Sequence, residues 1–251
     1  MAQRPHLARS ASADPLYKHV KHEIVRSLTE GEWKPGQLMP SEAKLAGRYS
    51  VAISTIRAAL AELAMAGVVV RRQGKGTFVA IHGEEQSVYR HFHVVRNDGR
   101  KGLPVSEVVS FRKAAAEDEA ADLLALPRTP APQVFKLRNI LRVGGVAIAV
   151  SDIVLPASVF GGLTVRMLGE GRILYAVYQQ RFGITIVRTT EKVRSVGADA
   201  VAAKVFGMRL SEPVLEVRRV AYTFGGMPVE VRRSQFDTRP HHYAIEQGED
   251  A

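Results

Sequence analysis

Apolar residues recur every four positions near the start of the chain, which is the spacing of one face of a helix. Asp14-Pro15 is suited to begin this helix, because Asp caps helix N-termini and Pro is tolerated at the first helical position. Gly31 is suited to end it. The pattern predicts a buried stripe formed by Leu16, Val20, Ile24 and Leu28. Residues 1–13 lack this periodicity, and we expect a disordered arm there.

Two further helices and a hairpin are predicted next. Ser41 can cap a short helix, and a longer helix that ends at Gly67 has the apolar stripe Ile56, Leu60 and Leu63. The hairpin follows as Val70-Arg-Arg-Gln-Gly-Lys-Gly-Thr-Phe. A short capped helix, a tight turn and a longer second helix form a helix-turn-helix unit, whose second helix fits the major groove of DNA. The basic hairpin would form a wing beside it.

Beyond Val79 the pattern changes to the alternation typical of strands. The strands are predicted at Tyr89–Arg96, Pro104–Arg112, Val134–Val143, Val146–Leu155, Ile184–Val196, Val214–Phe224 and Met227–Phe236. Helices are predicted at about Glu117–Leu124, Ile173–Phe182 and Asp199–Phe206. Gly144-Gly145 and Gly225-Gly226 favour two-residue hairpin turns. We therefore expect an α+β chain with a DNA-binding domain at 14–80, a linker at 81–88, a mainly antiparallel second domain at 89–246 and a tail at 247–251.

Charge supports a nucleic-acid partner for the first domain. Lys and Arg outnumber Asp and Glu by 12 to 6 in residues 1–80 and by 23 to 19 in residues 81–251, so the positive excess per residue is denser in the first part. The chain has no Cys, and its histidines have no carboxylate or Cys at ligand spacing, so no metal site or cofactor is predicted. No apolar run has the length of a membrane span. We expect a soluble cytoplasmic protein, associated with the nucleoid when it is bound to DNA.

Residues 15–80 resemble the winged helix-turn-helix of the GntR-type bacterial transcription regulators. The resemblance rests on Pro35-Gly, Met39-Pro-Ser-Glu, Thr55-Ile-Arg, Ala59-Leu and Arg72-Gln-Gly-Lys-Gly-Thr-Phe. This resemblance, together with the basic and polar positions of the two helix-turn-helix helices and the wing, predicts a set of DNA contacts. The residues are Lys44, Ser54, Thr55, Arg57, Arg71, Arg72, Lys75 and Gly76. Among these, Arg57 can bind guanine in bidentate fashion.

The chain departs from the family pattern at contact positions. Ala43 stands where the family usually has Arg, and Ala52-Ile53 stands where it commonly has Ser-Arg. Ala is a poor N-cap, costing on the order of 1 kcal/mol relative to Ser. We therefore expect an operator that differs from the common family sites.

The second domain resembles the UTRA effector domain of the HutC-like branch of these regulators, which shares its fold with chorismate lyase. The motifs that carry this resemblance are Val94-Val-Arg-Asn-Asp-Gly, Pro104-Val-Ser-Glu-Val-Val, Leu174-Tyr, Phe182-Gly-Ile, Pro213-Val-Leu-Glu-Val-Arg-Arg and Pro228-Val-Glu. The resemblance implies a homodimer that binds a small-molecule effector and a pseudo-palindromic operator on double-stranded DNA.

The effector pocket of that family usually has an Arg-x-Arg pair, an acidic residue, a Ser before a helix, and a Glu and a Tyr near the C-terminus. Glu230 and Tyr243 match, whereas Asn139 and Leu141 occupy the arginine positions and Ile173 replaces the Ser. The polar candidates are Arg138, Asp152, Tyr175, Arg188, Glu230, Arg232 and Tyr243. Because side chains alternate along a strand, Glu230 and Arg232 share a face and could simply pair with each other.

Two other functions remain possible at this point. The second domain could be a chorismate-lyase-like enzyme fused to a DNA-binding head, although no catalytic triad, nucleotide-binding loop or paired-carboxylate motif is evident and no catalytic residue is predicted. Alternatively, the chain could bind DNA without sequence preference through charge alone. The single well-formed head argues against this second alternative, and we expect an effector-controlled regulator, most often a repressor in this family.

Overall fold

The computed structural model describes residues 15–81, 92–98, 102, 104–169 and 173–245. The expected arm at 1–13, the Asp14 cap, most of the linker at 81–88 and the tail at 247–251 lie outside these residues. The chain divides into two compact units, Met1–Ala80 and Ile81–Ala251, and each is described by itself. Among the described residues, no helix is long and apolar enough to cross a membrane.

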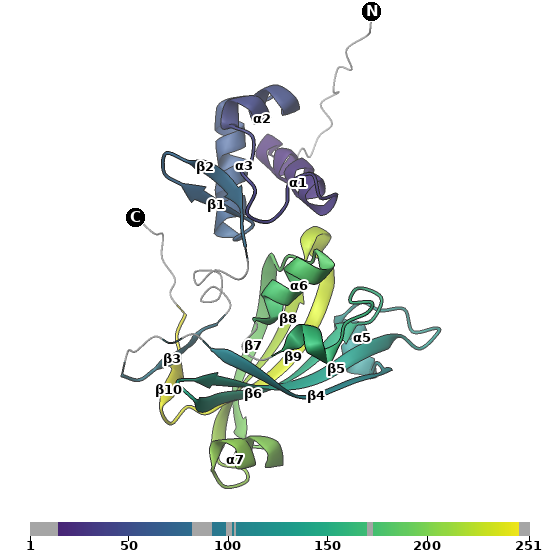
Figure 1. Ribbon diagram of the computed structural model, residues 1–251, viewed down its shortest axis with the longest axis vertical. Coiled ribbons are helices and arrows are strands. Elements are labelled where there is room, and N and C mark those ends of the chain that lie inside the picture. Colours follow the sequence, from purple (N-terminus) through teal and green to yellow (C-terminus); the bar gives the residue numbers. More distant parts are fainter. Residues whose placement is uncertain (1–14, 82–91, 99–101, 103, 170–172, 246–251) are drawn as a thin grey trace, which may run out of the picture. The chain divides into compact units, whose positions relative to one another are not determined.

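The first unit contains three helices and a hairpin (Figure 1). The helices are α1 (Leu16–Thr29), α2 (Glu42–Tyr49) and α3 (Ile53–Met65), and the hairpin strands are β1 (Val69–Arg72) and β2 (Gly76–Val79). The predicted helices and wing are thus confirmed. The stripe of α1 is buried as predicted except at Leu16, which is 54% exposed because it begins the helix. Pro15 occupies the N-cap of α1, whereas the sequence predicted it at the first helical position, one residue further into the helix.

The helix caps follow the side chains present. Ser41 caps α2, since its Oγ accepts a hydrogen bond from the backbone N–H of Lys44 at 3.3 Å. Ala52 occupies the N-cap of α3 and has no side chain that can accept such a bond. The first turn of α3 therefore lacks a side-chain cap, as the sequence predicted.

The wing is anchored on the segment before α2. Met39 donates its backbone N–H to Thr77 at 2.8 Å, and Val79 donates to Gln37 at 2.9 Å, so this segment adds a third strand-like edge to the hairpin. Gly76 has a φ of +106°, and a Cβ at this position would lie 2.9 Å from Leu38 Cδ1. Only glycine combines this backbone angle with such a close approach.

The second unit is built on a six-stranded antiparallel sheet in the order β4-β5-β6-β9-β8-β7. Its strands are β4 (Val105–Ala115), β5 (Gln133–Val143), β6 (Val146–Pro156), β7 (Arg188–Gly197), β8 (Pro213–Tyr222) and β9 (Pro228–Phe236). The other elements are α5 (Asp118–Leu123), α6 (Leu174–Phe182), α7 (Ala200–Phe206), the 3-10 turns η1 (Val165–Leu168) and η2 (Phe224–Gly226), and a separate pair, β3 (Val94–Arg96) with β10 (His241–Tyr243). The α+β class and the antiparallel sheet are confirmed.

Differences from the predicted strands are local. Gly144-Gly145 forms the expected two-residue turn, with positive φ at both glycines and Val143 paired with Val146. Gly225-Gly226 does not, because β8 and β9 are joined through η2 after a register shift at Ala221/Tyr222. Residues 184–187 precede β7 and do not belong to it. The strand predicted at Tyr89–Arg96 is shorter: β3 begins at Val94, residues 92–93 precede it, and residues 89–91 lie outside the described residues.

The two faces of the sheet pack against different helices. On one face, which we call the α6 face, Tyr178 and Phe160 pack with the strand residues Leu137 and Ile153. On the opposite face, the α7 face, Ala202 and Phe206 of α7 pack with Ile140 and Val150. Successive residues of β5 and β6 thus pack in different hydrophobic cores, because side chains alternate between the two faces of a sheet.

Candidate DNA and effector sites

Glu42 brings together two arginines of the first unit. Its Oε2 accepts a hydrogen bond from Arg57 Nε at 2.7 Å, and its Oε1 lies 3.7 Å from Arg71 Nη2. Arg71 also donates to the backbone carbonyl of Arg57 at 3.2 Å. One carboxylate at the start of α2 therefore ties the beginning of α3 to the first strand of the wing. Arg57 is 67% exposed, and its two terminal nitrogens form no hydrogen bond with the described residues.

The other predicted DNA contacts lie on the surface of the same unit. Lys44, Ser54, Arg72, Lys75 and Gly76 are exposed, and Thr55 is half-buried. The Arg72 guanidinium lies 4.9 Å from the centre of the Phe78 ring, a cation–π contact that holds it against the wing. The exposed residues Ala43, Ala52 and Ile53 add a small apolar surface where the family pattern has polar side chains.

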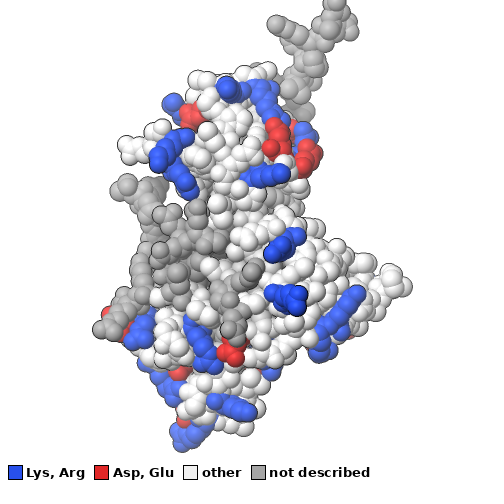
Figure 2. Space-filling view, viewed as in Figure 1, with Lys and Arg blue, Asp and Glu red and all other residues white. Residues whose placement is uncertain are grey.

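Charge by itself does not mark the DNA-binding surface. Figure 2 shows Lys and Arg side chains on the visible face of both units. What distinguishes the first unit is the combination of an exposed α3 N-terminus, an oriented arginine and a basic wing.

The α6 face carries a buried polar cluster centred on Glu230. The Glu230 carboxylate accepts hydrogen bonds from Tyr175 at 3.1 Å and Tyr178 at 2.7 Å, and it pairs with Arg232 through Nε at 2.9 Å and Nη2 at 2.8 Å. Glu230 is fully buried and the Arg232 side chain is 12% exposed. Burial alone would lower the pKa of Arg232, but the Glu230 carboxylate outweighs it and raises the pKa.

The cluster continues toward the C-terminal strand. Arg219 of β8 pairs with Glu191 of β7, and its Nη1 lies 3.5 Å from the Tyr175 hydroxyl. The Tyr243 hydroxyl donates to Glu191. Burial, followed by this contact with Glu191, raises the pKa of Tyr243, so the hydroxyl stays protonated at neutral pH. The α6 face thus holds two arginines, each matched by its own carboxylate.

A row of small polar side chains lies beside this cluster. Asn139, Ser151 and Ser234 are adjacent across β5, β6 and β9, and all three are buried. Asn139 Nδ2 donates to Ser106 at 2.8 Å, and the two serine hydroxyls lie 2.7 Å apart. Asn139 Oδ1 is buried without a hydrogen-bond partner among the described residues, which leaves one acceptor unused.

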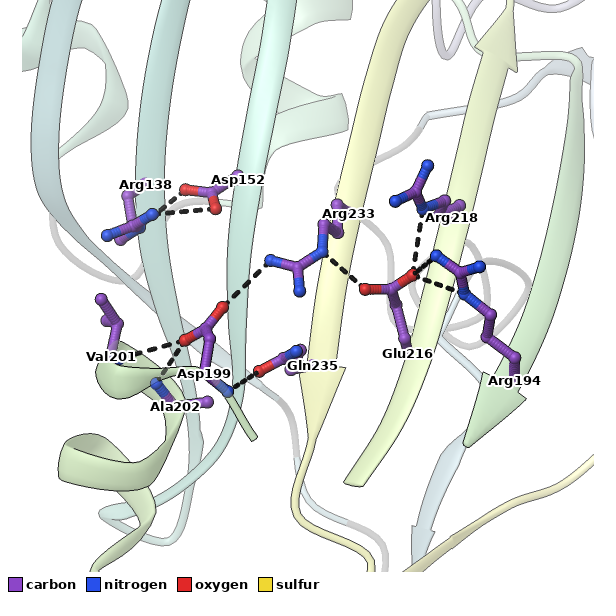
Figure 3. Close-up of polar contacts among 10 residues, drawn as sticks. All are labelled: Arg138, Asp152, Arg194, Asp199, Val201, Ala202, Glu216, Arg218, Arg233 and Gln235. Carbon is purple, nitrogen blue, oxygen red and sulfur yellow. Dashed lines mark hydrogen bonds and ion pairs between the residues drawn. The ribbon is translucent and has the colours of Figure 1, made fainter. Parts of the chain in front are cut away.

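The remaining effector candidates lie on the α7 face. Arg138 and Asp152 form a two-bonded ion pair at 2.6 and 2.9 Å, next to a network in which Arg233 contacts both Asp199 and Glu216 (Figure 3). Arg188 stacks on Tyr222, with its guanidinium 3.7 Å from the ring centre. The structure therefore brings Tyr175, Glu230, Arg232 and Tyr243 together and places Arg138 and Asp152 on the other side of the sheet.

Several site residues were not among the sequence candidates. The sequence points to Glu42 only through the Met39-Pro-Ser-Glu motif, and it does not predict Glu191, Arg219 or Tyr178 as site residues. Arg219 shares a strand face with the apolar residues Val217 and Ala221, and this spacing indicates a buried face. Only the pairing of β7 with β8 brings Glu191 next to Arg219.

Comparison with known proteins agrees with this geometry. The UTRA domain matches residues 99–242, and the family "Bacterial regulatory proteins, gntR family" matches residues 16–79. Similar proteins include the HTH-type transcriptional regulator SmoD of Agrobacterium fabrum, 28% identical over 89% of this chain and 92% of that protein. The regulator Rv0792c of Mycobacterium tuberculosis is 31% identical over 83% of this chain and 76% of that protein.

Solved structures show the same fold. The ligand-binding domain of a putative GntR-family transcriptional regulator from Bordetella bronchiseptica is 30% identical with a TM-score of 0.60, covering 64% of this chain and 99% of that one. PhnF from Mycobacterium smegmatis is 25% identical with a TM-score of 0.54, covering 92% of this chain and all of that one (100%).

A winged helix-turn-helix unit followed by a ligand-binding sheet domain defines a DNA-binding regulator controlled by an effector. This chain belongs to the GntR family of bacterial transcription regulators and carries a UTRA domain, the arrangement of the HutC-like branch. Its relatives are named as transcription regulators and repressors, not as enzymes.

Proposed function

We propose that this chain is a homodimeric repressor that reads a pseudo-palindromic operator with α3 and releases it when an effector binds the α6 face. The observation that carries the DNA half of this proposal is Arg57, which Glu42 holds by Nε at 2.7 Å. Its two terminal nitrogens are the pair that an end-on arginine uses to bind guanine O6 and N7. DNA binding also makes the bacterial cytoplasm its place of action.

The first test is operator binding by the purified full chain. Its affinity for DNA from its own upstream region is compared with that for a shuffled copy across a salt series. A specific site gives tight, protected binding to the native fragment alone. Equal and steeply salt-dependent binding to both would instead identify a protein that binds DNA through charge alone.

Two variants separate base reading from phosphate contact. Arg57→Ala should cost roughly 1 to 3 kcal/mol and relax the preference at one base pair. Lys75→Ala should reduce the salt slope by about one and leave the sequence preference unchanged. An equal loss on every sequence for Arg57→Ala would show that Arg57 contacts only the backbone.

The charge balance of the α6 face indicates the class of effector. Arg219 and Arg232 are matched by Glu191 and Glu230, so the cluster offers hydroxyl and amide groups and no excess positive charge. We therefore propose a neutral effector rich in hydroxyl groups. Two relatives are named as the probable fructoselysine utilization operon repressor and the mannosyl-D-glycerate system repressor MngR. A screen can therefore begin with sugar derivatives, comparing uncharged sugars with these two compounds, which share the hydroxyl groups but also have ionised groups.

Tyr243 provides the sharpest test of this location. Tyr243→Phe should keep operator affinity and weaken the release caused by an effector found in the screen, because the hydroxyl on Glu191 is lost. Tyr222→Phe is the matched control, since Tyr222 lies on the α7 face under Arg188. Equal effects of the two variants would place the effector elsewhere. Turnover of the effector during the assay would favour the enzyme alternative.

A further inference from the structure

The α7 face has a hollow with a volume of about 430 Å³, within the range of small-molecule sites. It lies on β4, β5 and β6, the half of the sheet that ends at the β4 edge, and on the side opposite to the α6 face cluster. Its lining residues are Ser110, Arg112, Glu117, Lys136, Leu137, Arg138, Asp152, Ile153 and Val154.

Two adjacent rows of the sheet place the charged side chains of this hollow. In one row Ser110, Arg138 and Asp152 are direct neighbours across the three strands. In the next row Arg112 lies directly opposite Lys136. Like charges at directly opposed positions destabilise a sheet, so this pair needs a negative partner.

Acidic residues of the chain neutralise the hollow only in part. Asp152 pairs with Arg138, and Glu117 pairs with Lys136. The hollow therefore has three basic groups against two acidic ones. The Glu117 carboxylate also attracts Arg112, but the Arg112 guanidinium forms no hydrogen bond or ion pair with the described residues. The Lys136 side chain is only 18% exposed, so water screens its charge poorly.

We propose that this hollow binds a small dianion, a phosphate or dicarboxylate group, between Arg112 and Lys136. Arg112 supplies a planar fork of donors, Lys136 supplies a compact charge, and the Ser110 hydroxyl completes the row. The site is separate from the α6 face and does not depend on the identity of the effector there. It adds a second ligand to the molecule on the opposite side of the sheet.

Glu117 occupies part of this site when no dianion is bound. It is 80% exposed at the N-terminal end of α5, and its pairing with Lys136 lowers its pKa, so it remains charged at neutral pH. A bound dianion competes with this carboxylate for Lys136. Glu117 thus sets a threshold that weakly charged or singly charged anions do not overcome.

Titration calorimetry of the full chain with inorganic phosphate tests the proposal, with sodium chloride holding the ionic strength constant. Arg112→Gln should weaken phosphate binding by about tenfold, the usual loss for one charge-assisted contact. Glu117→Gln should tighten binding several-fold because the internal competitor is removed. Lys113→Gln, the same charge change on the next residue, is the control and should bind as the wild type does, because alternation places Lys113 on the other face.

Parallel titration with succinate distinguishes a phosphate site from a dicarboxylate site, and either result supports a dianion site. Two outcomes overturn the proposal. One is the absence of binding of both ions at millimolar concentration. The other is an equal loss of phosphate affinity for Arg112→Gln and Lys113→Gln, which would indicate attraction by the overall charge.

Thermal melting of each variant checks that the fold is retained. Operator binding is measured separately, so a failure of the dianion site leaves the proposed function untouched.

Discussion

At the scale of single residues, Glu216 of β8 pairs with three arginines, more than any other carboxylate among the described residues of the second unit. Its carboxylate is 2% exposed and accepts hydrogen bonds from Arg194, Arg218 and Arg233 at 2.6 to 3.0 Å (Figure 3). Burial alone would raise the pKa of Glu216, but hydrogen bonds from Arg194, Arg233 and Arg218 outweigh it and lower the pKa to about 2.

This shift predicts a pH dependence of stability. A carboxyl with a lowered folded-state pKa stabilises the fold above its unfolded pKa, and this contribution is lost as the pH falls through the folded-state value. Glu216→Gln should therefore reduce the free energy of unfolding by about 2 to 3 kcal/mol at pH 7. The gap between wild type and variant should narrow steadily from pH 4.5 toward pH 2. Denaturant titrations at several pH values measure this gap, and a constant gap would show that the arginines do not perturb Glu216.

Sequence predicts residues on one face better than it predicts their partners. The two-residue spacing of Glu230 and Arg232 placed them on one face, where pairing was one of two possible roles, and the two side chains do pair. By contrast, Glu216 meets arginines from three strands, and those strands come together only through the strand order β9-β8-β7. Contacts within a strand follow from alternation, whereas contacts between strands require the register.

At the scale of elements, α3 has no side-chain cap at its N-terminus, and adding one should stabilise the first unit. Ala52→Ser should raise the free energy of unfolding of the first unit by about 0.5 to 1 kcal/mol, because the new hydroxyl can accept the backbone N–H of Thr55. That N–H now reaches the Ala52 carbonyl at 3.0 Å. The control is Ala58→Ser inside α3, which should lower stability slightly because Ser is the poorer helix former. Thermal unfolding measures both, and shifts of the same sign would contradict the capping argument.

The contact that Glu42 of α2 forms with Arg57 of α3 and Arg71 of the wing leads to a second prediction at this scale. Glu42→Gln removes a negative charge near the DNA, so electrostatics alone predicts tighter binding to every sequence. We expect instead that discrimination at the base read by Arg57 falls by up to about tenfold, because the guanidinium loses the carboxylate that orients it.

Competition binding against operators with single base changes measures this discrimination. Glu62→Gln is the matched control, since Glu62 lies on α3 and pairs with Lys21, away from Arg57. If Glu42→Gln and Glu62→Gln change affinity equally and leave discrimination intact, Glu42 does not position Arg57.

The elements themselves were largely predictable, and the exceptions have a local cause. Gly144-Gly145 formed the predicted turn because pairing resumes after a register shift at Leu141/Arg142 and continues to Val143 and Val146, which flank the two glycines. Gly225-Gly226 has the same sequence signal, but the register shift at Ala221/Tyr222 lengthens the connection. The three-residue strand β10 was missed because its pattern is too short to show alternation, and only its pairing with β3 defines it.

At the scale of the whole molecule, recognition is expected to depend on two heads acting together. The helix α3 covers too few base pairs to define a specific site alone, so a two-fold dimer should read two half-sites at a fixed spacing. Inserting about 5 base pairs between the half-sites turns one of them to the opposite side of the duplex, whereas inserting about 10 restores the side. We expect the half-turn insertion to reduce affinity to that of a single half-site, and the full-turn insertion to recover part of it.

Binding to this series of operators, together with the solution mass of the chain, tests the prediction. A dimer of 27.5 kDa chains has a mass of about 55 kDa by light scattering. If the half-turn insertion binds as tightly as the native spacing, the heads act independently. Effector control through their spacing would then fail too, because an effector changes operator affinity only by favouring one dimer geometry over another.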